Sequence, residues 1–219
     1  MNIKTSVLRE IVSFSREYLC HLDCFVLVYG SYASGHYCNT SDVDVFIVVD
    51  RYNSKDFTKS LNFLTDLHTR YNLKIDNEVP YINKLIVSYK DVIHAIALDP
   101  FIYKEEKYHV PPIRKSKKFL SSQEIRWRLI LNALTSPHLF IYGNKKKYLS
   151  FKNNMEKSIV RLASGLIGAQ KPTTNNLTKI LLTSVYGEEG EMYLGYKKER
   201  KEVVGYLKNL IKKSSVHSL

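Results

Sequence analysis

The sequence has few cysteines and no long apolar run. Its three cysteines, Cys20, Cys24 and Cys38, lack the even number and paired spacing of a disulfide framework, so reduced thiols are the simplest interpretation. No stretch approaches the ~18 consecutive apolar residues that a membrane span needs. The first twenty residues carry Arg9 and Glu10, where a secretory signal peptide would be apolar. These absences predict a cytoplasmic protein with no membrane segment.

A zinc site is the other use that the cysteines allow. Its ligands would be Cys20, Cys24, His36 and Cys38. The sequence contains no CxxC knuckle, and Cys20 and Cys24 fall at the end of an expected helix and the start of an expected strand. The pattern therefore favours free thiols over a zinc site.

Acidic residues are scarce in the second half of the chain. Residues 1–109 contain 12 Lys and Arg against 14 Asp and Glu, a net charge of −2, whereas residues 110–219 contain 21 against 7, a net charge of +14. Such an asymmetry indicates either an anionic partner, such as a nucleoside triphosphate, RNA or a phosphorylated substrate, or a solvated face that keeps the protein soluble. Charge alone does not separate these two interpretations.

Hydrophobic periodicity predicts a mixed first half. Short apolar runs rich in β-forming residues indicate buried strands, and apolar residues at helical spacing indicate amphipathic helices. The expected elements are a helix at 4–20, strands at 24–29 and 43–49 with a short helix from Ser31 between them, a helix at 54–71 with Ser54 as its N-cap, an alternating strand at 73–79, and a strand or helix within 84–98.

The second half is expected to be mostly helical. The expected elements are a proline-containing linker at 99–118, a helix at 125–134, a short strand or extended segment at 139–143, and helices at 145–167, 174–185 and 196–213. The fold class is therefore α+β, with a small mixed sheet flanked by helices in a domain at 1–110. A basic, mostly helical domain follows at 111–219.

One stretch combines glycine, hydroxyl and carboxylate groups between two expected strands. It runs through 29–49 and reads "YGSYASGHYCNTSDVDVFIVV". Asp42 and Asp44, two residues apart on a strand, project to the same face and can bind one cluster of metal ions. Gly30 lets the backbone approach phosphate oxygens, and the Ser31 hydroxyl can hold them. An isolated Asp-x-Asp is more often a turn cap with a surface residue, but the Gly-Ser pair at this spacing favours a metal site.

A third carboxylate is expected from the alternating segment at 73–79. Asp76 and Glu78 lie on the same face of this expected strand. Asp76 is the first choice for the third ligand and Glu78 is the alternative. Taken alone, both acids are more typical of a solvated strand face. Three carboxylates can hold two Mg²⁺ ions about 3.5–4 Å apart, which activates an attacking oxygen and neutralises a leaving pyrophosphate.

At these residues the chain resembles the nucleotidyltransferase superfamily related to DNA polymerase beta. The pattern of that family is a hydrophobic residue, Gly-Ser or Gly-Gly, a spacer, and Asp-x-Asp flanked by hydrophobic residues. The resemblance covers about residues 5–100 and implies a small mixed sheet flanked by helices. It implies an enzyme that moves a nucleoside monophosphate from an NTP to an acceptor and releases pyrophosphate. The matching positions are Tyr29, Gly30, Ser31, Ser41, Asp42 and Asp44.

The resemblance implies roles for these residues. Asp42 and Asp44 would bind two Mg²⁺ ions, with Mn²⁺ as a substitute, and Asp76, or Glu78 in its place, would bind one ion and orient the acceptor hydroxyl. The triphosphate of an NTP, with ATP as the first candidate, would lie against the Gly-Ser turn. The expected nucleotide-binding residues are Gly30, Ser31 and Ser41. Apart from the resemblance, Lys145–Lys147 and Arg126 or Arg128 of the second half are candidates to meet charge on the triphosphate or on the acceptor.

The acceptor is left open by the sequence. An α/β half before a helical half resembles the antibiotic nucleotidyltransferases, so a hydroxyl of a small molecule is the first expectation. The basic second half also suits RNA, tRNA in particular, or a protein as acceptor. A third alternative is a non-catalytic nucleotide-binding or toxin-neutralising protein of the same fold, although neither carboxylate of the Asp-x-Asp motif is missing here.

Overall fold

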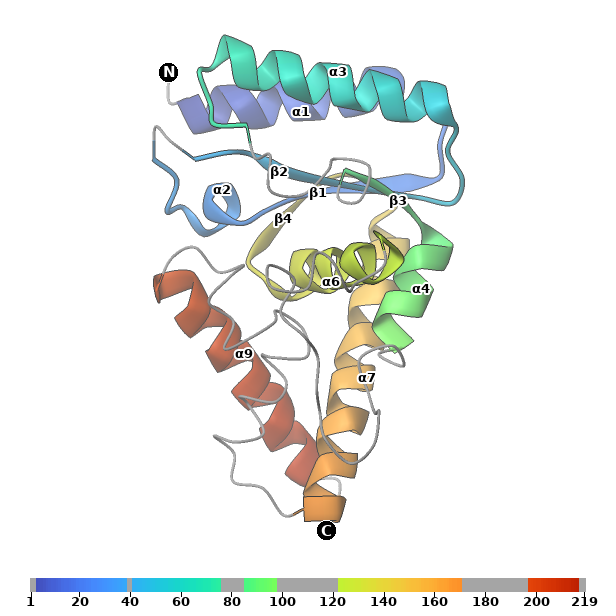
Figure 1. The fold of residues 1–219 in the computed structure, drawn as a ribbon, viewed down its shortest axis with the longest axis vertical. Helices are drawn as coiled ribbons and strands as arrows, with labels where there is room; N and C mark the ends of the chain where they lie inside the picture. The colour runs from blue at the N-terminus through green and yellow to red at the C-terminus, as the bar shows by residue number, and fades with distance from the viewer. Residues whose placement is uncertain (1–2, 39–40, 76–84, 98–121, 171–196, 217–219) are drawn as a thin grey trace. The chain divides into compact units, whose positions relative to one another are not determined.

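The chain folds into two units in a computed structural model (Figure 1). The structure describes residues 3–38, 41–75, 85–97, 122–170 and 197–216. The first unit comprises residues 1–92 and 137–149, and the second comprises residues 93–136 and 150–219. No described helix is long and apolar enough to cross a membrane.

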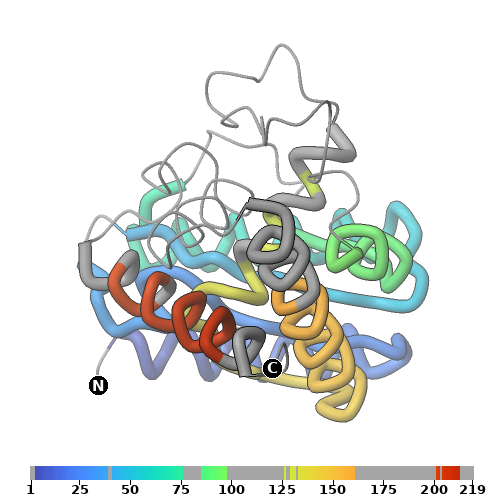
Figure 2. The backbone as a smooth tube through the Cα atoms, turned by 90° about the horizontal axis from the view of Figure 1, so that it is seen from below, coloured from blue at the N-terminus to red at the C-terminus, as the bar shows by residue number. Residues whose placement is uncertain are grey.

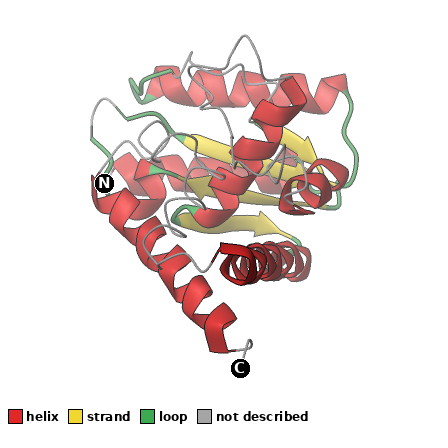
Figure 3. Ribbon diagram, turned by 60° about the horizontal axis from the view of Figure 1, so that its bottom comes forward, coloured by secondary structure: helices red, strands yellow, loops and turns green. Residues whose placement is uncertain are grey.

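A four-stranded mixed sheet forms the centre of the first unit (Figure 3). The strand order is β3-β2-β1-β4; β1 pairs antiparallel with both β2 and β4, and β2 pairs parallel with β3. This arrangement confirms the predicted α+β class with a small mixed sheet. The strands are β1 (Cys24–Tyr29), β2 (Asp44–Val49), β3 (Ile86–Ser88) and β4 (His138–Gly143).

The two central strands are buried on both faces, as their unbroken apolar sequences predict. Every residue of β1 is buried, and so is every residue of β2 after the first. That first residue, Asp44, is partly exposed. The sheet thus places one carboxylate at the start of a strand that is otherwise apolar.

Two helices, α1 (Ile3–Tyr18) and α3 (Ser54–Arg70), cover one face of the sheet (Figure 1). The ring of Phe14 in α1 stacks on that of Phe63 in α3, with centroids 4.1 Å apart. Because side chains alternate along a strand, only every second residue of β1 and β2 reaches this layer. The shared core includes Val7, Ile11, Leu64, Leu67, Val26, Val28, Val43, Val45 and Ile47.

Aromatic side chains of the first unit line the other face of the sheet. The ring centroid of Phe25 lies 6.4 Å from that of Tyr89 and 5.7 Å from that of Tyr148. Tyr89 begins α4 (Tyr89–Ala97), and Tyr148 lies near the start of α7 (Lys145–Gln170). β3 followed by α4 confirms the strand or helix that was expected within 84–98.

The edge strand β4 comes from far along the chain. It follows α6 (Ser122–Thr135) and pairs with β1, beside which it lies in Figure 2. The pairing shifts register between Val26 and Leu27. The first unit therefore includes β4, which the sequence assigned to the second domain. Local sequence patterns do not show which distant strand pairs with β1.

The second unit is helical where it is described. It contains the part of α4 from residue 93, α6, the part of α7 from residue 150, and α9 (Lys197–Val216). The Tyr206 hydroxyl of α9 donates a hydrogen bond to Glu156 Oε1 of α7 at 2.9 Å. The expected helix at 174–185 and the expected linker at 99–118 lie outside the described residues.

The start of α3 differs from the sequence prediction by one residue. Asn53, not Ser54, is the N-cap: its Oδ1 accepts hydrogen bonds from the amides of Lys55 and Asp56 at 2.8 and 3.1 Å. Asp56 Oδ2 accepts a hydrogen bond from the Asn53 amide at 2.9 Å. These bonds form a capping box, which satisfies amides that the first helical turn leaves unpaired.

The end of α3 also differs from the prediction, since residues 73–75 do not form a strand. Asn72 has a left-handed backbone with φ of 51°, and the Leu73 amide donates to the His68 carbonyl at 2.8 Å. Such a bond closes a helix end. The start of the predicted strand is therefore used to terminate α3, and residues 76–79 lie outside the described part of the chain.

Candidate functional site

The end of β1 and the start of β2 meet at one corner of the sheet. Tyr29, the last residue of β1, pairs with Asp44, the first residue of β2. Gly30 follows Tyr29 and leads into the short helix α2 (Ser31–Ser34), which was expected at this place. We refer to the place where Gly30 and Asp44 meet as the β1–β2 corner.

Gly30 and Asp44 are in close contact at this corner. Gly30 has φ of 69° and ψ of −146°, a conformation that is essentially restricted to glycine. A Cβ atom at Gly30 would lie 2.5 Å from Asp44 Oδ2. The missing side chain of Gly30 therefore provides the space in which the Asp44 carboxylate lies.

Asp42 and Asp44 flank a buried valine. Val43, between them, is only 3% exposed and belongs to the core beneath α1 and α3, as does Val45. Because side chains alternate along a strand, Asp44 lies on the opposite side of β2 from Val45. Both carboxylates are partly exposed. The structure thus brings together two of the three predicted carboxylates and the predicted Gly-Ser turn.

Tyr32 of α2 lies close to Asp42. Its side chain is 1% exposed, and its hydroxyl has no hydrogen-bond partner among the described residues. Burial, and then the nearby Tyr37, Asp42 and Cys38, raise the pKa of Tyr32 above its ordinary value. The phenol is therefore neutral at physiological pH and adds no negative charge beside the carboxylates.

Ser41 shapes the loop that enters the corner. Its Oγ accepts a hydrogen bond from the Cys38 amide at 2.9 Å, and its own amide donates to the Cys38 carbonyl at 2.9 Å. The Ser41 side chain is 6% exposed. In this structure Ser41 holds the backbone that leads to Asp42, and its predicted contact with a triphosphate stays a prediction.

His68 of α3 supports the same segment from the core. Its Nε2 lies 3.2 Å from the Val43 amide nitrogen, and its Nδ1 lies 2.7 Å from the Leu64 carbonyl oxygen. A carbonyl can only accept and an amide N–H can only donate, so the ring is neutral with its proton on Nδ1. Sequence reasoning missed His68, because no motif marks it and its contact depends on how α3 packs.

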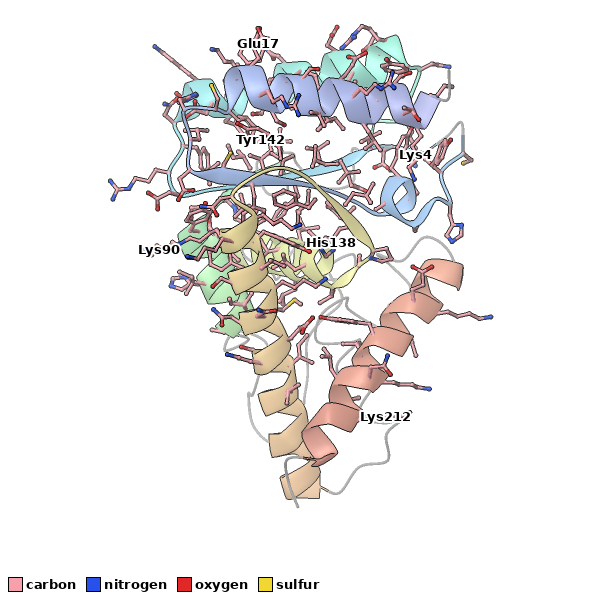
Figure 4. The ribbon with its side chains drawn as sticks, turned by 180° about the vertical axis from the view of Figure 1, so that it is seen from behind. Lys4, Glu17, Lys90, His138, Tyr142 and Lys212 are labelled. Carbon is pink, nitrogen blue, oxygen red and sulfur yellow. The ribbon has the colours of Figure 1, made fainter. Side chains whose placement is uncertain are left out.

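His138 extends the site face on the other side of β1. Tyr29 pairs with Asp44 in β2 and with His138 in β4, so these three side chains lie in one row on one face. Figure 4 shows His138 and Tyr142 on opposite sides of β4. His138 Nε2 lies 2.7 Å from the Tyr148 hydroxyl. Sequence reasoning missed His138. The apolar run at 139–143 predicts a strand but does not show that this strand pairs with β1.

The predicted lysine contacts come from the start of α7. This helix begins at Lys145, two residues after Gly143, which pairs with Phe25 near the start of β1. Lys147 Nζ lies 4.8 Å from the centre of the Tyr89 ring. A contact of Lys145–Lys147 with charge on the triphosphate or the acceptor stays a prediction.

The expected contacts of the two arginines stay predictions. Arg126 belongs to the second unit, and the Arg128 side chain lies outside the described residues. The basic groups that would meet an anionic substrate thus stay unassigned by this structure.

The third carboxylate falls outside the described residues, which include neither Asp76 nor Glu78. Within the described ranges, no group of three or more His, Cys, Asp or Glu side chains could hold a metal ion. Asp42 and Asp44 still fit a hard divalent cation, because both offer carboxylate oxygens and Asp44 lies in a space that a Cβ would fill. They would supply two protein ligands of a larger set.

Comparison with known proteins agrees with this geometry. The model of the family described as polymerase beta, nucleotidyltransferase, matches residues 24–106. No curated protein and no solved structure matches the chain. The matched range begins with β1 and contains the Gly-Ser turn, the Asp-x-Asp motif, and both candidates for the third carboxylate. Residues 24–106 are thus similar to the nucleotidyltransferase family related to DNA polymerase beta.

Proposed function

We propose that this protein transfers a nucleoside monophosphate from an NTP, ATP as first candidate, to a hydroxyl group of a small-molecule acceptor. A bond forms between the acceptor oxygen and the α-phosphorus, the bond to the bridging oxygen breaks, and pyrophosphate leaves. The observation that carries this proposal is the close contact of Gly30 with the Asp44 carboxylate, within the segment that matches the nucleotidyltransferase family.

Asp42 and Asp44 are the proposed ligands of two Mg²⁺ ions, and Asp76, with Glu78 as the alternative, is the proposed third carboxylate. Bound Mg²⁺ would lower the pKa of the acceptor hydroxyl and neutralise charge on the departing pyrophosphate. The partial exposure of Asp42 and Asp44 on either side of the buried Val43 supports this assignment. The third carboxylate would also orient the acceptor hydroxyl and take up its proton.

Gly30 and Ser31 are the proposed site for the triphosphate. The absence of a Cβ at Gly30 lets phosphate oxygens approach the backbone beside Asp44. Tyr32 is neutral next to Asp42, so it does not repel an anionic substrate. These residues bind and orient the nucleotide, while the carboxylates hold the cations that compensate its charge.

His138 is the proposed further contact to the nucleotide. Its row with Tyr29 and Asp44 puts its Cα two strand spacings from that of Asp44, about 10 Å. A nucleoside triphosphate bound at Asp44 and extending across β1 would come within reach of the imidazole. The hydrogen bond to Tyr148 holds the ring at this edge of the sheet.

The proposal is tested with labelled nucleotide. Wild type, the double variant Asp42→Asn/Asp44→Asn and the control Asp50→Asn are incubated with α-labelled ATP, Mg²⁺ and a panel of hydroxyl-bearing small molecules, RNA and proteins. Asp50 follows β2 at its other end, and its side chain is 61% exposed. We expect label transfer by wild type and Asp50→Asn but not by the double variant. Equal signal from all three proteins would contradict catalysis at this site.

Nucleotidyl transfer to RNA is the second candidate function. It is favoured by the net charge of +14 on residues 110–219, because lysine and arginine contacts to phosphates supply most non-specific affinity for nucleic acids. Among the described residues of the second unit, Lys157, Lys201 and Lys212 are exposed. The label-transfer panel separates the candidates, since labelled RNA would replace the labelled small molecule as product.

A further inference from the structure

We propose that His68 is a positioning residue for the metal site. It would hold the backbone between Asp42 and Asp44 so that both carboxylates bind the same ions. His68 itself would contact neither metal nor substrate. This inference rests on the proposed function, because it assigns a task to a residue behind the proposed metal ligands.

The Val43 amide depends on His68 for its hydrogen bond. The pairing of β2 with β1 ends at Asp44, so Val43 lies just beyond the ladder, yet it is only 3% exposed. His68 Nε2 accepts its N–H at 3.2 Å. A buried N–H that is left without an acceptor destabilises the folded state. The imidazole therefore takes the place of a missing strand partner at the residue between the two carboxylates.

The imidazole is itself held at two points. Its Nδ1–H donates to the Leu64 carbonyl at 2.7 Å, and the side chain is 1% exposed within the core between α3 and the sheet. These contacts select one tautomer and leave the ring little freedom to turn. Because the ring is fixed on α3, its hydrogen bond holds the Val43 nitrogen in place relative to α3.

Holding the Val43 nitrogen places Asp42. The peptide unit that includes this nitrogen is planar and begins at Asp42 Cα, so fixing the plane fixes the point from which the Asp42 side chain leaves the backbone. Asp44 is located separately, by its close contact with Gly30. The two carboxylates are thus positioned from opposite sides, Asp44 by the Gly-Ser turn and Asp42 by α3.

A matched pair of variants separates the two hydrogen bonds of His68. In His68→Asn the shorter amide side chain reaches the place of Nδ1 and can donate to Leu64, but it is too short for Val43. In His68→Gln the longer amide reaches the place of Nε2, and its oxygen can accept from Val43. Both variants replace the ring by an amide, so they differ chiefly in which bond survives.

The measurement is the affinity of the full-length protein for Mn²⁺ in the presence of ATP, followed by the spin resonance of free Mn²⁺. We expect His68→Asn to weaken Mn²⁺ binding by about 10- to 100-fold, the usual effect of losing a group that orients a ligand. We expect His68→Gln to stay within about threefold of wild type. The inference would be overturned if both variants lost the same Mn²⁺ affinity or the same stability. It would also be overturned if neither variant lost affinity.

Two further proteins complete the experiment. Leu64→Ala removes core packing one turn before His68 and should lower the urea midpoint of unfolding without changing Mn²⁺ affinity in the folded protein. If Leu64→Ala weakens Mn²⁺ binding as much as His68→Asn, the role of His68 is stability alone and the inference fails. If Asp42→Asn/Asp44→Asn binds Mn²⁺ like wild type, the proposed function fails instead.

Discussion

At the scale of single residues, the β1–β2 corner depends on the absence of a side chain at Gly30. Gly30 combines a positive φ with a position at which any Cβ would collide with the Asp44 carboxylate. Gly35, a few residues later, has a similar φ of 79° but open space around its Cα. Replacing either glycine by alanine would therefore strain the backbone. Only at Gly30 would the added methyl group also collide with another side chain.

Gly30→Ala should damage the site more than the fold. We expect both Gly30→Ala and Gly35→Ala to lower the free energy of unfolding by about 1–3 kcal/mol, because alanine is strained at these φ values. Only Gly30→Ala would also push the Asp44 carboxylate away, so only this variant should bind Mg²⁺-ATP about tenfold or more weakly. Urea unfolding and calorimetric titration measure the two effects. Equal loss of nucleotide affinity in both variants would contradict the assigned role of Gly30.

Local spacing predicted the Gly-Ser turn and the Asp-x-Asp motif, because the residues of each motif lie next to one another in the sequence. His68 was beyond such reasoning, since one histidine on a helix face looks like any other until α3 packs on the sheet. The contact with Val43 joins residues 25 positions apart. The third carboxylate stays a prediction, with Asp76 and Glu78 both outside the described residues.

At the scale of elements, α3 carries His68 and begins with a strong cap. Asn53→Ala removes the acceptor for two amides of the first turn and should lower the free energy of unfolding by about 1 kcal/mol. Ser54→Ala is the control and should change it by less than about 0.5 kcal/mol. Thermal and urea unfolding provide the comparison. A larger loss for Ser54→Ala would show that the cap had been assigned to the wrong residue.

β4 brings a histidine to the site that the linear sequence did not indicate. His138→Ala should weaken Mg²⁺-ATP binding by about 2- to 10-fold, the value of one hydrogen bond. His21→Ala, an identical change at a side chain that is 58% exposed before β1, should leave the affinity unchanged. Calorimetric titration of Mg²⁺-ATP compares them. Wild-type affinity in His138→Ala would remove His138 from the nucleotide site.

Element prediction succeeded where burial is local and failed where a partner is distant. The apolar runs of β1 and β2 and the helical spacing of α1 and α3 were sufficient to place these elements. The alternation at 73–79 was misleading at its start, because Leu73 closes α3 instead of pairing in the sheet. No local pattern could show that β4 pairs with β1, since that pairing joins segments from different halves of the chain.

At the scale of the whole molecule, the charge distribution separates the two candidate acceptors. If RNA is the acceptor, its binding should weaken by about 10³- to 10⁵-fold between 50 and 200 mM salt, because each phosphate contact releases counterions. A small acceptor bound by a few groups should show a much weaker dependence. Retention of labelled tRNA on immobilised protein across a salt series measures this. Absence of retention even at the lowest salt would exclude RNA as the acceptor.

The central claim is that the β1–β2 corner binds a nucleoside triphosphate through divalent cations on Asp42 and Asp44. Calorimetric titration of Mg²⁺-ATP into wild type, Asp42→Asn/Asp44→Asn and Asp50→Asn tests it most directly, since it needs no knowledge of the acceptor. The account predicts saturable binding by wild type and Asp50→Asn, and binding at least about tenfold weaker by the double variant. Equal affinity in all three proteins, or no binding by wild type, would contradict it.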